Sequence, residues 1–268
     1  MVIRVAVTGA AGRMGAEVVR AVWRAEDLLL VAAVDVRRVN TDAGALAGLG
    51  EIGVPVRDNL EGVLDEVRPD VLVDFTAAAA AVQNARIALG KGVRPVVGTT
   101  GIPAAELEAL RRLSATLGVG AVVAPNFALG AVLMMRFAAE AARFFPHVEI
   151  IELHHDQKID APSGTALKTA ELLAEARGDF RQGLPTEELK LPGVRGGTYD
   201  GGIRIHSVRL PGLVAHQEVI FGGTGQTLTI RHDSTSRESF MPGVLLAVRK
   251  VMNLREFVYG LDRLLFET

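Results

Sequence analysis

The chain has 268 residues, 49% of them hydrophobic, with a formal net charge of −2 and no cysteine. That length suits one large domain or two modest ones, and the lack of cysteine excludes disulfides, thiolate nucleophiles and cysteine-ligated metals. The charge balance lacks the basic character that nucleic acid requires, and no uncharged apolar stretch reaches about 18 residues, so we expect neither nucleic acid nor a membrane as a partner. A strand predicted to begin at residue 2 or 3 leaves no room for a signal peptide, which predicts a cytoplasmic protein.

A glycine-rich loop lies between the first predicted strand, residues 3–7, and the first predicted helix, residues 13–25. Its glycines, Gly9, Gly12 and Gly15, are spaced G-x-x-G-x-x-G. Small residues let the backbone turn tightly and approach a pyrophosphate, and the helix that follows offers N–H groups and the positive end of its dipole to that anion. The strand–loop–helix context predicts dinucleotide binding. The alternative is a glycine loop that serves only packing in an ordinary βαβ unit.

The second predicted strand, residues 28–34, is an unbroken apolar run of the kind that is buried on both faces of a parallel sheet. It ends at Asp35, where an acidic side chain can accept hydrogen bonds from the hydroxyls of the adenosine ribose. Arg37 and Arg38 follow and could instead hold a 2′-phosphate. Asp35 favours NAD and the arginines leave NADP open, so we predict that both NADH and NADPH are used, with NADH bound at least as well.

Strands and helices continue to alternate up to residue 127. Residues 39–60 are expected to be irregular, apart from a short strand over 54–57. The predicted helices cover 60–67, 77–89 and 103–117, and the predicted strands cover 71–75, 94–97 and 120–124. This alternation predicts an α/β fold, a Rossmann-like parallel sheet with helices on both faces. Such sheets bind ligands at the carboxyl ends of their strands, where this chain has Gly9, Asp35, Phe75, Thr76, Gly98, Thr99, Thr100, Ala124, Pro125, Asn126 and Phe127.

The pattern changes after about residue 127, which predicts a second domain. A helix is expected over 130–145, a strand over 148–153 and a helix over 163–178, followed by a loop-rich stretch over 179–202. Two long runs then alternate polar and apolar residues, 203–210 and 217–232, the second interrupted by two glycines. Such alternation indicates antiparallel strands with one exposed or interface face. We therefore predict an α+β domain with a mixed or antiparallel sheet over 127–239, and a dinucleotide-binding domain over 1–126 to which a helical stretch, 240–268, returns.

The densest group of reactive side chains lies at residues 152–166, where a predicted strand ends and a helix begins. His154, His155 and Lys158 lie there with the helix start at Ser163. A histidine donates a proton near neutral pH, a lysine is a point charge for a carboxylate, and a helix N-terminus offers N–H donors to another. Together with a hydride carrier, the group predicts reduction of a small dicarboxylate with a protonation step. No metal is predicted, because adjacent histidines on a strand point to opposite faces and chelate poorly.

These motifs closely resemble those of the 4-hydroxy-tetrahydrodipicolinate reductase family, also called the dihydrodipicolinate reductase family, over nearly the whole chain. The resemblance is carried by the glycine loop, by Gly98-Thr99-Thr100-Gly101, by Ala124-Pro125-Asn126-Phe127 and by the long motif that runs from Glu152 to Ala166. It implies that NAD(P)H reduces the cyclic imine made by the preceding synthase of diaminopimelate and lysine synthesis. It also implies a homotetramer assembled through the sheets of the second domain.

The resemblance also implies roles for individual residues. His154 is implied to be the proton donor and acceptor, and Lys158 a proton donor that also contacts a carboxylate. The implied substrate contacts are His155, Gly164, Thr165 and Thr100. The implied cofactor contacts are Gly9, Ala10, Ala11, Gly12, Arg13, Met14, Asp35, Phe75, Thr76, Gly98, Thr99, Thr100, Ala124, Pro125, Asn126 and Phe127.

The chain departs from the family pattern in two places, and other readings remain open. Asp35 is followed by Val36 where some members have Glu-Arg, and alanines follow Thr76 where members often carry a charge. Arg237 is a candidate cofactor contact, with a plain surface arginine as the alternative. A different two-domain amino-acid dehydrogenase would need another catalytic set, and a non-catalytic nucleotide sensor would not need His154 and Lys158.

Overall fold

The computed structural model describes residues 2–266. The chain divides into two compact units, residues 2–127 with 240–266 in the first and residues 128–239 in the second. Within these described residues, no helix is long and apolar enough to cross a membrane.

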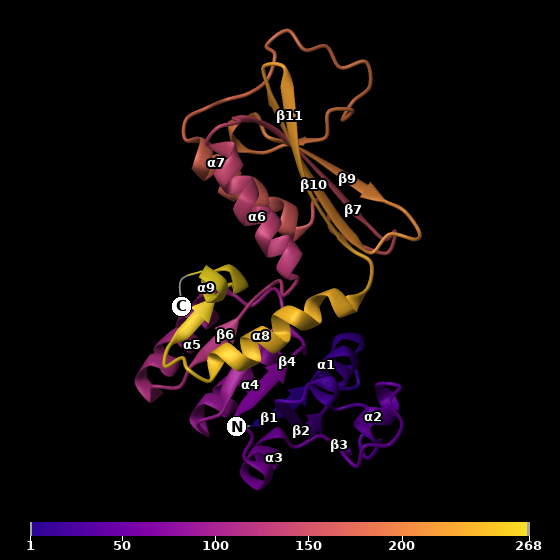
Figure 1. Ribbon diagram of the computed structural model, residues 1–268, viewed down its shortest axis with the longest axis vertical. Helices are drawn as coiled ribbons and strands as arrows, with labels where there is room; N and C mark the ends of the chain where they lie inside the picture. The colour runs from indigo at the N-terminus through magenta and orange to yellow at the C-terminus, as the bar shows by residue number, and fades with distance from the viewer. Residues whose placement is uncertain (1, 267–268) are drawn as a thin grey trace. The chain divides into compact units, whose positions relative to one another are not determined.

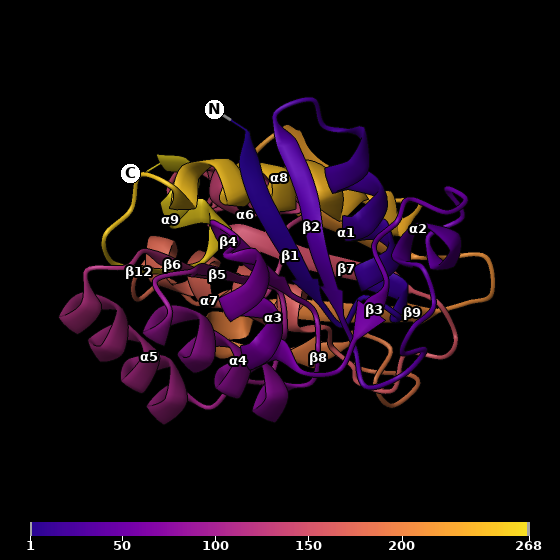
Figure 2. The same ribbon diagram turned by 90° about the horizontal axis from the view of Figure 1, so that it is seen from below.

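The first unit is built on a parallel sheet (Figure 1), whose strands lie in the order β12-β6-β5-β4-β1-β2-β3, as the labels of Figure 2 show. Apolar runs form its central strands, and β1 and β4 are buried along most of their length because helices cover both faces. The strands are β1 (Ile3–Thr8), β2 (Leu28–Val34), β3 (Val56–Arg57), β4 (Val71–Asp74), β5 (Arg94–Val97), β6 (Ala121–Val123) and β12 (Phe257–Tyr259).

Helices pack on both faces of this sheet (Figure 2). Leu60, Val63 and Ala88 bury one face against β1, β2 and β4, while Ala85 and Leu110 bury it against β5 and β6. The first of these groups lies on α3 (Leu60–Val67) and α4 (Ala78–Gly90), and Leu110 lies on α5 (Ala104–Leu117). On the other face are α1 (Arg13–Arg24) and α8 (Met241–Val251), and the unit also contains α2 (Ala43–Leu46) and α9 (Leu261–Phe266). The predicted Rossmann-like sheet is thus confirmed.

The second unit has a mixed sheet in the order β11-β10-β7-β9-β8, with α6 (Leu129–Ala142) and α7 (Gly164–Arg177) against one face. Its core contains Ile150 and Phe221 from the sheet and Ala138 and Leu173 from the two helices. The strands are β7 (His147–His154), β8 (Gly197–Thr198), β9 (Arg204–Arg209), β10 (Ala215–Gly223) and β11 (Gln226–Ser234). This unit confirms the predicted mixed sheet.

The direction of β9 differs from the expectation. Alternation over residues 203–210 was expected to indicate antiparallel pairing, yet β9 runs parallel to β7, whereas β10 is antiparallel to both β7 and β11. Alternation reports only that one face of a strand is exposed. The direction follows from the connection, since α7 lies between β7 and β9 and a crossover of this kind joins parallel strands.

Two segments also differ from the sequence prediction. The C-terminal stretch is not helical throughout, because β12 interrupts it and adds an edge strand beside β6. Residues 39–60 hold the short helix α2, and the carboxylate of Asp42 orders this stretch by accepting hydrogen bonds from the backbone of residues 44, 45, 52, 53 and 54. Neither feature has an apolar repeat long enough to be read from sequence.

Candidate active site

The glycine loop is a tight backbone cradle. Gly9 has φ of 74°, a left-handed conformation that favours glycine, and a Cβ there would lie 2.7 Å from the carbonyl oxygen of Phe75. A Cβ at Gly15 would lie 2.0 Å from the carbonyl oxygen of Gly9, so the first turn of α1 packs directly on the loop. Gly12 caps α1 with no side-chain hydrogen bond, which leaves the helix N-terminus open to an anion. The loop therefore fits a dinucleotide pyrophosphate.

Asp35 follows β2 and is tied to this loop. Its Oδ2 accepts a hydrogen bond from the backbone N–H of Ala11 (3.1 Å), and its Oδ1 accepts one from the backbone N–H of Arg37 (2.9 Å). The Nε of Arg37 lies 3.5 Å from Oδ1, and its guanidinium reaches to 3.8 Å from the Cβ position of Gly12. The carboxylate of Asp35, suited to ribose hydroxyls, and the guanidinium of Arg37, suited to a phosphate, therefore lie together beside the glycine loop.

The ends of β1, β4 and β5 are joined by the buried carboxylate of Asp74. It accepts hydrogen bonds from the hydroxyl of Thr8 (2.6 Å), the amide of Asn84 (2.7 Å) and both the backbone N–H and the hydroxyl of Thr76. The hydroxyl of Thr99 approaches the same carboxylate at 3.3 Å. Asp74 is therefore a structural hub, and neither Thr8 nor Asn84 was singled out from the sequence.

The remaining cofactor candidates of the first unit lie around this hub with unequal exposure. Phe75 packs against Phe127 with ring centroids 6.0 Å apart, and a Cβ at Gly98 would lie 2.1 Å from the Phe75 ring. Thr99, Ala124 and Phe127 are buried, Asn126 is partly exposed, and Thr100 and Pro125 are exposed. Of the loop residues, Ala10 is buried, Ala11 and Met14 are partly exposed, and Arg13 is exposed. The exposed and partly exposed candidates are available to contact a ligand, whereas the buried ones pack beneath the carboxyl ends of the strands.

In the second unit, His154 ends β7 and is backed by Glu152, two residues earlier on the same face of the strand. The Nδ1 of His154 lies 2.5 Å from Oε2 of Glu152, whose side chain is 0% exposed. Arg209 of β9 donates to both carboxylate oxygens, at 2.9 and 2.8 Å. Burial by itself would raise the pKa of Glu152, but the hydrogen bonds from His154 and Arg209 outweigh it and hold this pKa at about 2. No sequence motif indicates Arg209, which lies 57 residues from Glu152 along the chain.

Lys158 and the start of α7 complete this cluster. The Nζ of Lys158 lies 2.7 and 2.9 Å from the two carboxylate oxygens of Asp160, whose pKa the hydrogen bond lowers. The hydroxyl of Ser163 caps α7 by accepting from the backbone N–H of Ala166 (3.2 Å). Gly164 is exposed and a Cβ there would meet no atom within 4 Å, so a ligand can approach the helix N-terminus closely. His155 and Thr165 are both partly exposed beside this start.

Arg237 belongs to neither group. It opens a short 3-10 turn, Arg237–Phe240, at the end of the second unit, and it is exposed. No group of three or more His, Asp or Glu side chains that could hold a metal occurs within residues 2–266.

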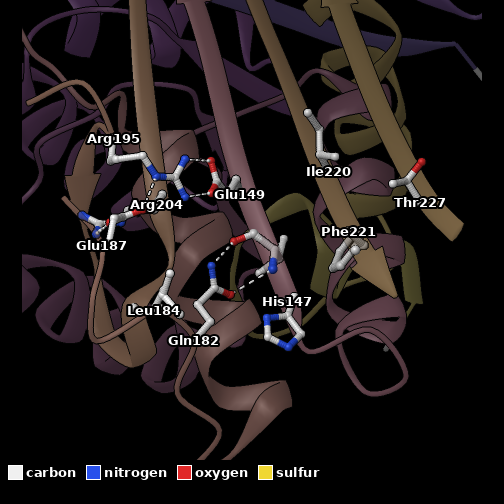
Figure 3. Close-up of a pocket in the computed structure, with 14 residues that line it drawn as sticks. His147, Glu149, Gln182, Leu184, Glu187, Arg195, Arg204, Ile220, Phe221 and Thr227 are labelled. Carbon is white, nitrogen blue, oxygen red and sulfur yellow. Dashed lines mark hydrogen bonds and ion pairs between the residues drawn. The ribbon is translucent and has the colours of Figure 1, made fainter. Parts of the chain in front are cut away.

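A cavity of about 540 Å³ lies at the opposite end of β7 from His154 (Figure 3). Gln182 bonds there to both the N–H (2.9 Å) and the carbonyl (2.8 Å) of Val148, and Arg195 pairs with Glu149. These contacts fasten the 179–202 stretch to the sheet. The cavity contains none of the residues singled out from the sequence, so its size does not make it the active site.

The buried Glu152 predicts an acid-sensitive stability. A carboxylate whose pKa falls from an ordinary 4.5 to about 2 on folding stabilises the native state fully above pH 4.5, and this contribution is lost as the pH falls towards 2. We expect the thermal midpoint of Glu152→Gln to fall less steeply between pH 5 and pH 3 than that of the wild type. Circular dichroism melts at several pH values measure this slope.

Glu171→Gln is the matched control, because Glu171 forms only a surface pair with Lys168 on α7. A surface pair of this kind contributes about 0–1 kcal/mol. This control should keep the pH slope of the wild type. Identical slopes for all three proteins would show that Glu152 is not ionised differently in the folded and unfolded chains.

Comparison with known proteins identifies the family. Residues 3–127 match the N-terminal domain described as "Dihydrodipicolinate reductase, N-terminus", and residues 130–265 match "Dihydrodipicolinate reductase, C-terminus". The chain is 61% identical over 263 residues to 4-hydroxy-tetrahydrodipicolinate reductase of Moorella thermoacetica, covering 98% of each chain.

Solved structures agree with this assignment. Dipicolinate-bound dihydrodipicolinate reductase from Paenisporosarcina sp. TG-14 superposes with a TM-score of 0.89 at 48% identity, over 98% of this chain and 99% of that one. Amine dehydrogenase from Mycobacterium smegmatis superposes with a TM-score of 0.69 over 97% of this chain and 95% of that one, but at 18% identity this likeness shows the fold alone. With both halves and nearly its full length matched, the chain belongs to the dihydrodipicolinate reductase family.

Proposed function

We propose that this protein reduces 4-hydroxy-tetrahydrodipicolinate to tetrahydrodipicolinate, with loss of the hydroxyl group as water, for lysine and diaminopimelate synthesis, and that His154 and Lys158 transfer the proton. It is an oxidoreductase of that reductase family. The observation that best supports the proposed roles is the grouping, on one stretch of the second unit, of His154 backed by an ionised carboxylate, Lys158 and the open start of α7. A dicarboxylate meets both positive charge and N–H donors there.

The nicotinamide supplies the hydride when NADH or NADPH is bound. The residues of the chain bind the cofactor and the substrate and transfer the proton. The Nε2 of His154 faces away from Glu152 and is the atom that gives a proton to the substrate. Lys158 exchanges Asp160 for a substrate carboxylate. Gly164 and Thr165 at the start of α7, with His155 and Thr100, bind the acid groups. The glycine loop over residues 9–14 and the strand ends around Asp74 bind the cofactor.

One coupled assay tests this function. The purified protein is mixed with the preceding synthase, pyruvate and aspartate semialdehyde, and the absorbance at 340 nm is followed with each cofactor. Cofactor oxidation that requires both the synthase and its substrates supports the reductase. Binding of the cofactor without turnover would favour a nucleotide sensor, and turnover only with free amino acids would favour another two-domain dehydrogenase.

For the cofactor, we propose that both NADH and NADPH are used and that NADH binds at least as well. The carboxylate of Asp35 can accept hydrogen bonds from the ribose hydroxyls, and its negative charge repels a 2′-phosphate. The positive charge of Arg37 beside it offsets that repulsion. Arg37 beside Asp35 can therefore serve in place of the arginine that some family members carry at the position of Val36. The exposed Arg237 is a further candidate contact for the cofactor.

Side-by-side titration of NADH and NADPH checks this arrangement. We expect Arg37→Gln to weaken NADPH binding about 10-fold with little change for NADH, because only NADPH carries the phosphate that the guanidinium contacts. Arg86→Gln is the control, because Arg86 lies on α4 and pairs with Glu106 of α5, and its variant should leave both affinities within about twofold of the wild type. A wild-type preference for NADPH beyond about 100-fold, roughly 2.7 kcal/mol, would contradict the role of Asp35.

We also propose a homotetramer assembled through the second unit, working in the cytoplasm where cellular NAD(P)H is available. The helices α6 and α7 cover one face of the mixed sheet, and the other face carries Ile151, Leu153 and Ile220 among charged residues. A sheet face with apolar residues suits contact with a second sheet. Light scattering on the purified protein, compared with the chain mass of 28.4 kDa, measures the assembly.

A further inference from the structure

Glu152 is a buried carboxylate that the reaction outlined above does not use directly. Its side chain is 0% exposed, and it lies behind His154, which is 15% exposed. Strand geometry explains the placement, because residues two apart on β7 share a face. Glu152 therefore reaches only one nitrogen of the His154 ring, Nδ1, at 2.5 Å.

Besides His154, the side chain of Arg209 and the backbone of Ser163 hold the carboxylate of Glu152. Arg209 approaches as a fork, with one guanidinium nitrogen 2.9 Å from Oε2 and the other 2.8 Å from Oε1. The backbone N–H of Ser163 donates to Oε1 at 3.3 Å. Bidentate pairs of this kind fix orientation as well as charge, so Glu152 has little freedom to turn away from His154.

This arrangement decides which ring nitrogen carries the proton. An ionised carboxylate can only accept hydrogen bonds, so Nδ1 of His154 must donate. The neutral ring is then protonated on Nδ1, and Nε2 is the nitrogen that gains and loses a proton. On β10 the residues paired with Glu152 and His154 are Gln217 and Ala215, which are uncharged, whereas on β9 His154 is paired with the cationic Arg209.

Arg209 has a second contact that links it to Lys158. The guanidinium nitrogen that donates to Oε1 of Glu152 also donates to the backbone carbonyl of Asp160, at 2.8 Å. Asp160 in turn holds Nζ of Lys158 through its carboxylate. One arginine thus fastens both the carboxylate behind His154 and the loop that carries Lys158.

We infer that Glu152 and Arg209 are positioning residues for the reduction: Glu152 keeps the proton of neutral His154 on Nδ1 so that Nε2 exchanges protons with the substrate, and Arg209 keeps Glu152 and the Lys158 loop in place. In the transfer the Nε2–H bond of the imidazolium breaks, the substrate gains that proton, and the ring becomes neutral with its Nδ1–H still donating to Glu152. The inference rests on the proposed role of His154 as proton donor.

A kinetic cycle tests whether Glu152 acts through His154. We expect Glu152→Gln to lower kcat about 10-fold or more, with KM and the NADH Kd within about twofold, and the alkaline limb of the kcat profile to move to lower pH. Adding Glu152→Gln to His154→Gln should lower kcat no further, because the residue it orients is already gone. Additive losses, or a wild-type kcat for Glu152→Gln, would overturn the inference.

Glu149→Gln is a closely matched control. Glu149 lies three residues earlier on β7 and is also bonded to an arginine and a histidine, Arg195 and His206. It has no contact with His154, so its variant should keep the wild-type kcat and pH profile whatever happens to the melting temperature. An equal loss of kcat in both variants would mean that Glu152 has only a general structural role.

Nitrogen-15 NMR of labelled histidine in the ligand-free protein separates this inference from the proposed function. The His154 signals are assigned by their loss in His154→Gln, and we expect protonation on Nδ1 in the neutral ring of the wild type and mixed tautomers in Glu152→Gln. A wild-type ring protonated on Nε2 would overturn the inference even in an active reductase, whereas absence of turnover in the coupled assay would overturn the proposed function and leave only the Nδ1 tautomer to be decided by NMR. If Glu152→Gln fails to fold, Arg209→Lys, which keeps the charge but loses the fork, should lower kcat about 10-fold, and an unchanged kcat would be a refutation.

Discussion

Replacement of His154 by glutamine is expected to lower kcat about 100-fold to 10,000-fold, the range that a positioned general acid contributes. Glutamine fills a similar volume but cannot donate a proton from a cationic ring. The Kd for NADH should stay nearly unchanged, because His154 belongs to the second unit whereas the glycine loop belongs to the first. Steady-state kinetics in the coupled assay and a fluorescence titration with NADH measure the two effects separately.

His206→Gln serves as the control for this substitution. His206 lies on β9 and bonds to Glu149, so it belongs to a different cluster of the same sheet. It should keep the wild-type kcat. A wild-type rate for His154→Gln would reject its role as the proton donor and leave the reduction to some other acid.

Replacement of Lys158 by alanine is expected to lower kcat and raise KM together. Lys158 is a cation placed for a carboxylate, and a hydrogen bond between charged groups contributes about 1.5–3 kcal/mol, which corresponds to roughly 10-fold to 150-fold in kcat/KM. Its Nζ lies 2.7 Å from an oxygen of Asp160, so the lysine must exchange this surface partner for the carboxylate of the substrate. Initial rates over a range of substrate concentrations separate the two parameters.

Lys168→Ala provides the comparison, since Lys168 lies on α7 and pairs only with Glu171 on the surface. It should change neither kcat nor KM. If Lys158→Ala altered the melting temperature but left both kinetic parameters at the wild-type values, Lys158 would be a structural residue and the proposed role would be wrong.

Two clusters of the same composition on one sheet show why residue type alone does not identify a site. Glu152 and Glu149 both lie on β7, and each bonds one arginine and one histidine. Only the cluster of Glu152 lies beside a lysine and the open start of a long helix. The nearby lysine and helix start, rather than the Glu–Arg–His group itself, distinguish a site suited to a dicarboxylate from a group that fastens a loop.

Features that depend on local residue patterns can be predicted from the amino-acid sequence. Unbroken apolar runs such as residues 71–73, which are fully buried, are typical of parallel strands covered by helices and predict the first unit. The glycine spacing predicts the loop because Gly9 needs a left-handed conformation and Gly15 leaves no room for a side chain. The motif from Glu152 to Ala166 indicates the family because its reactive residues are close together along the chain.

Features that depend on which distant segments pair are seen only in the folded chain. Residues 203–210 alternate in polarity whichever way the strand runs, so the parallel direction of β9 followed from its crossover through α7 and not from its pattern. The same pairing brings Arg209 to Glu152 across 57 residues, and the edge position of β12 similarly depends on β6. Periodicity records which face of a segment is buried, whereas the partner that buries it is fixed by the packing of the whole unit.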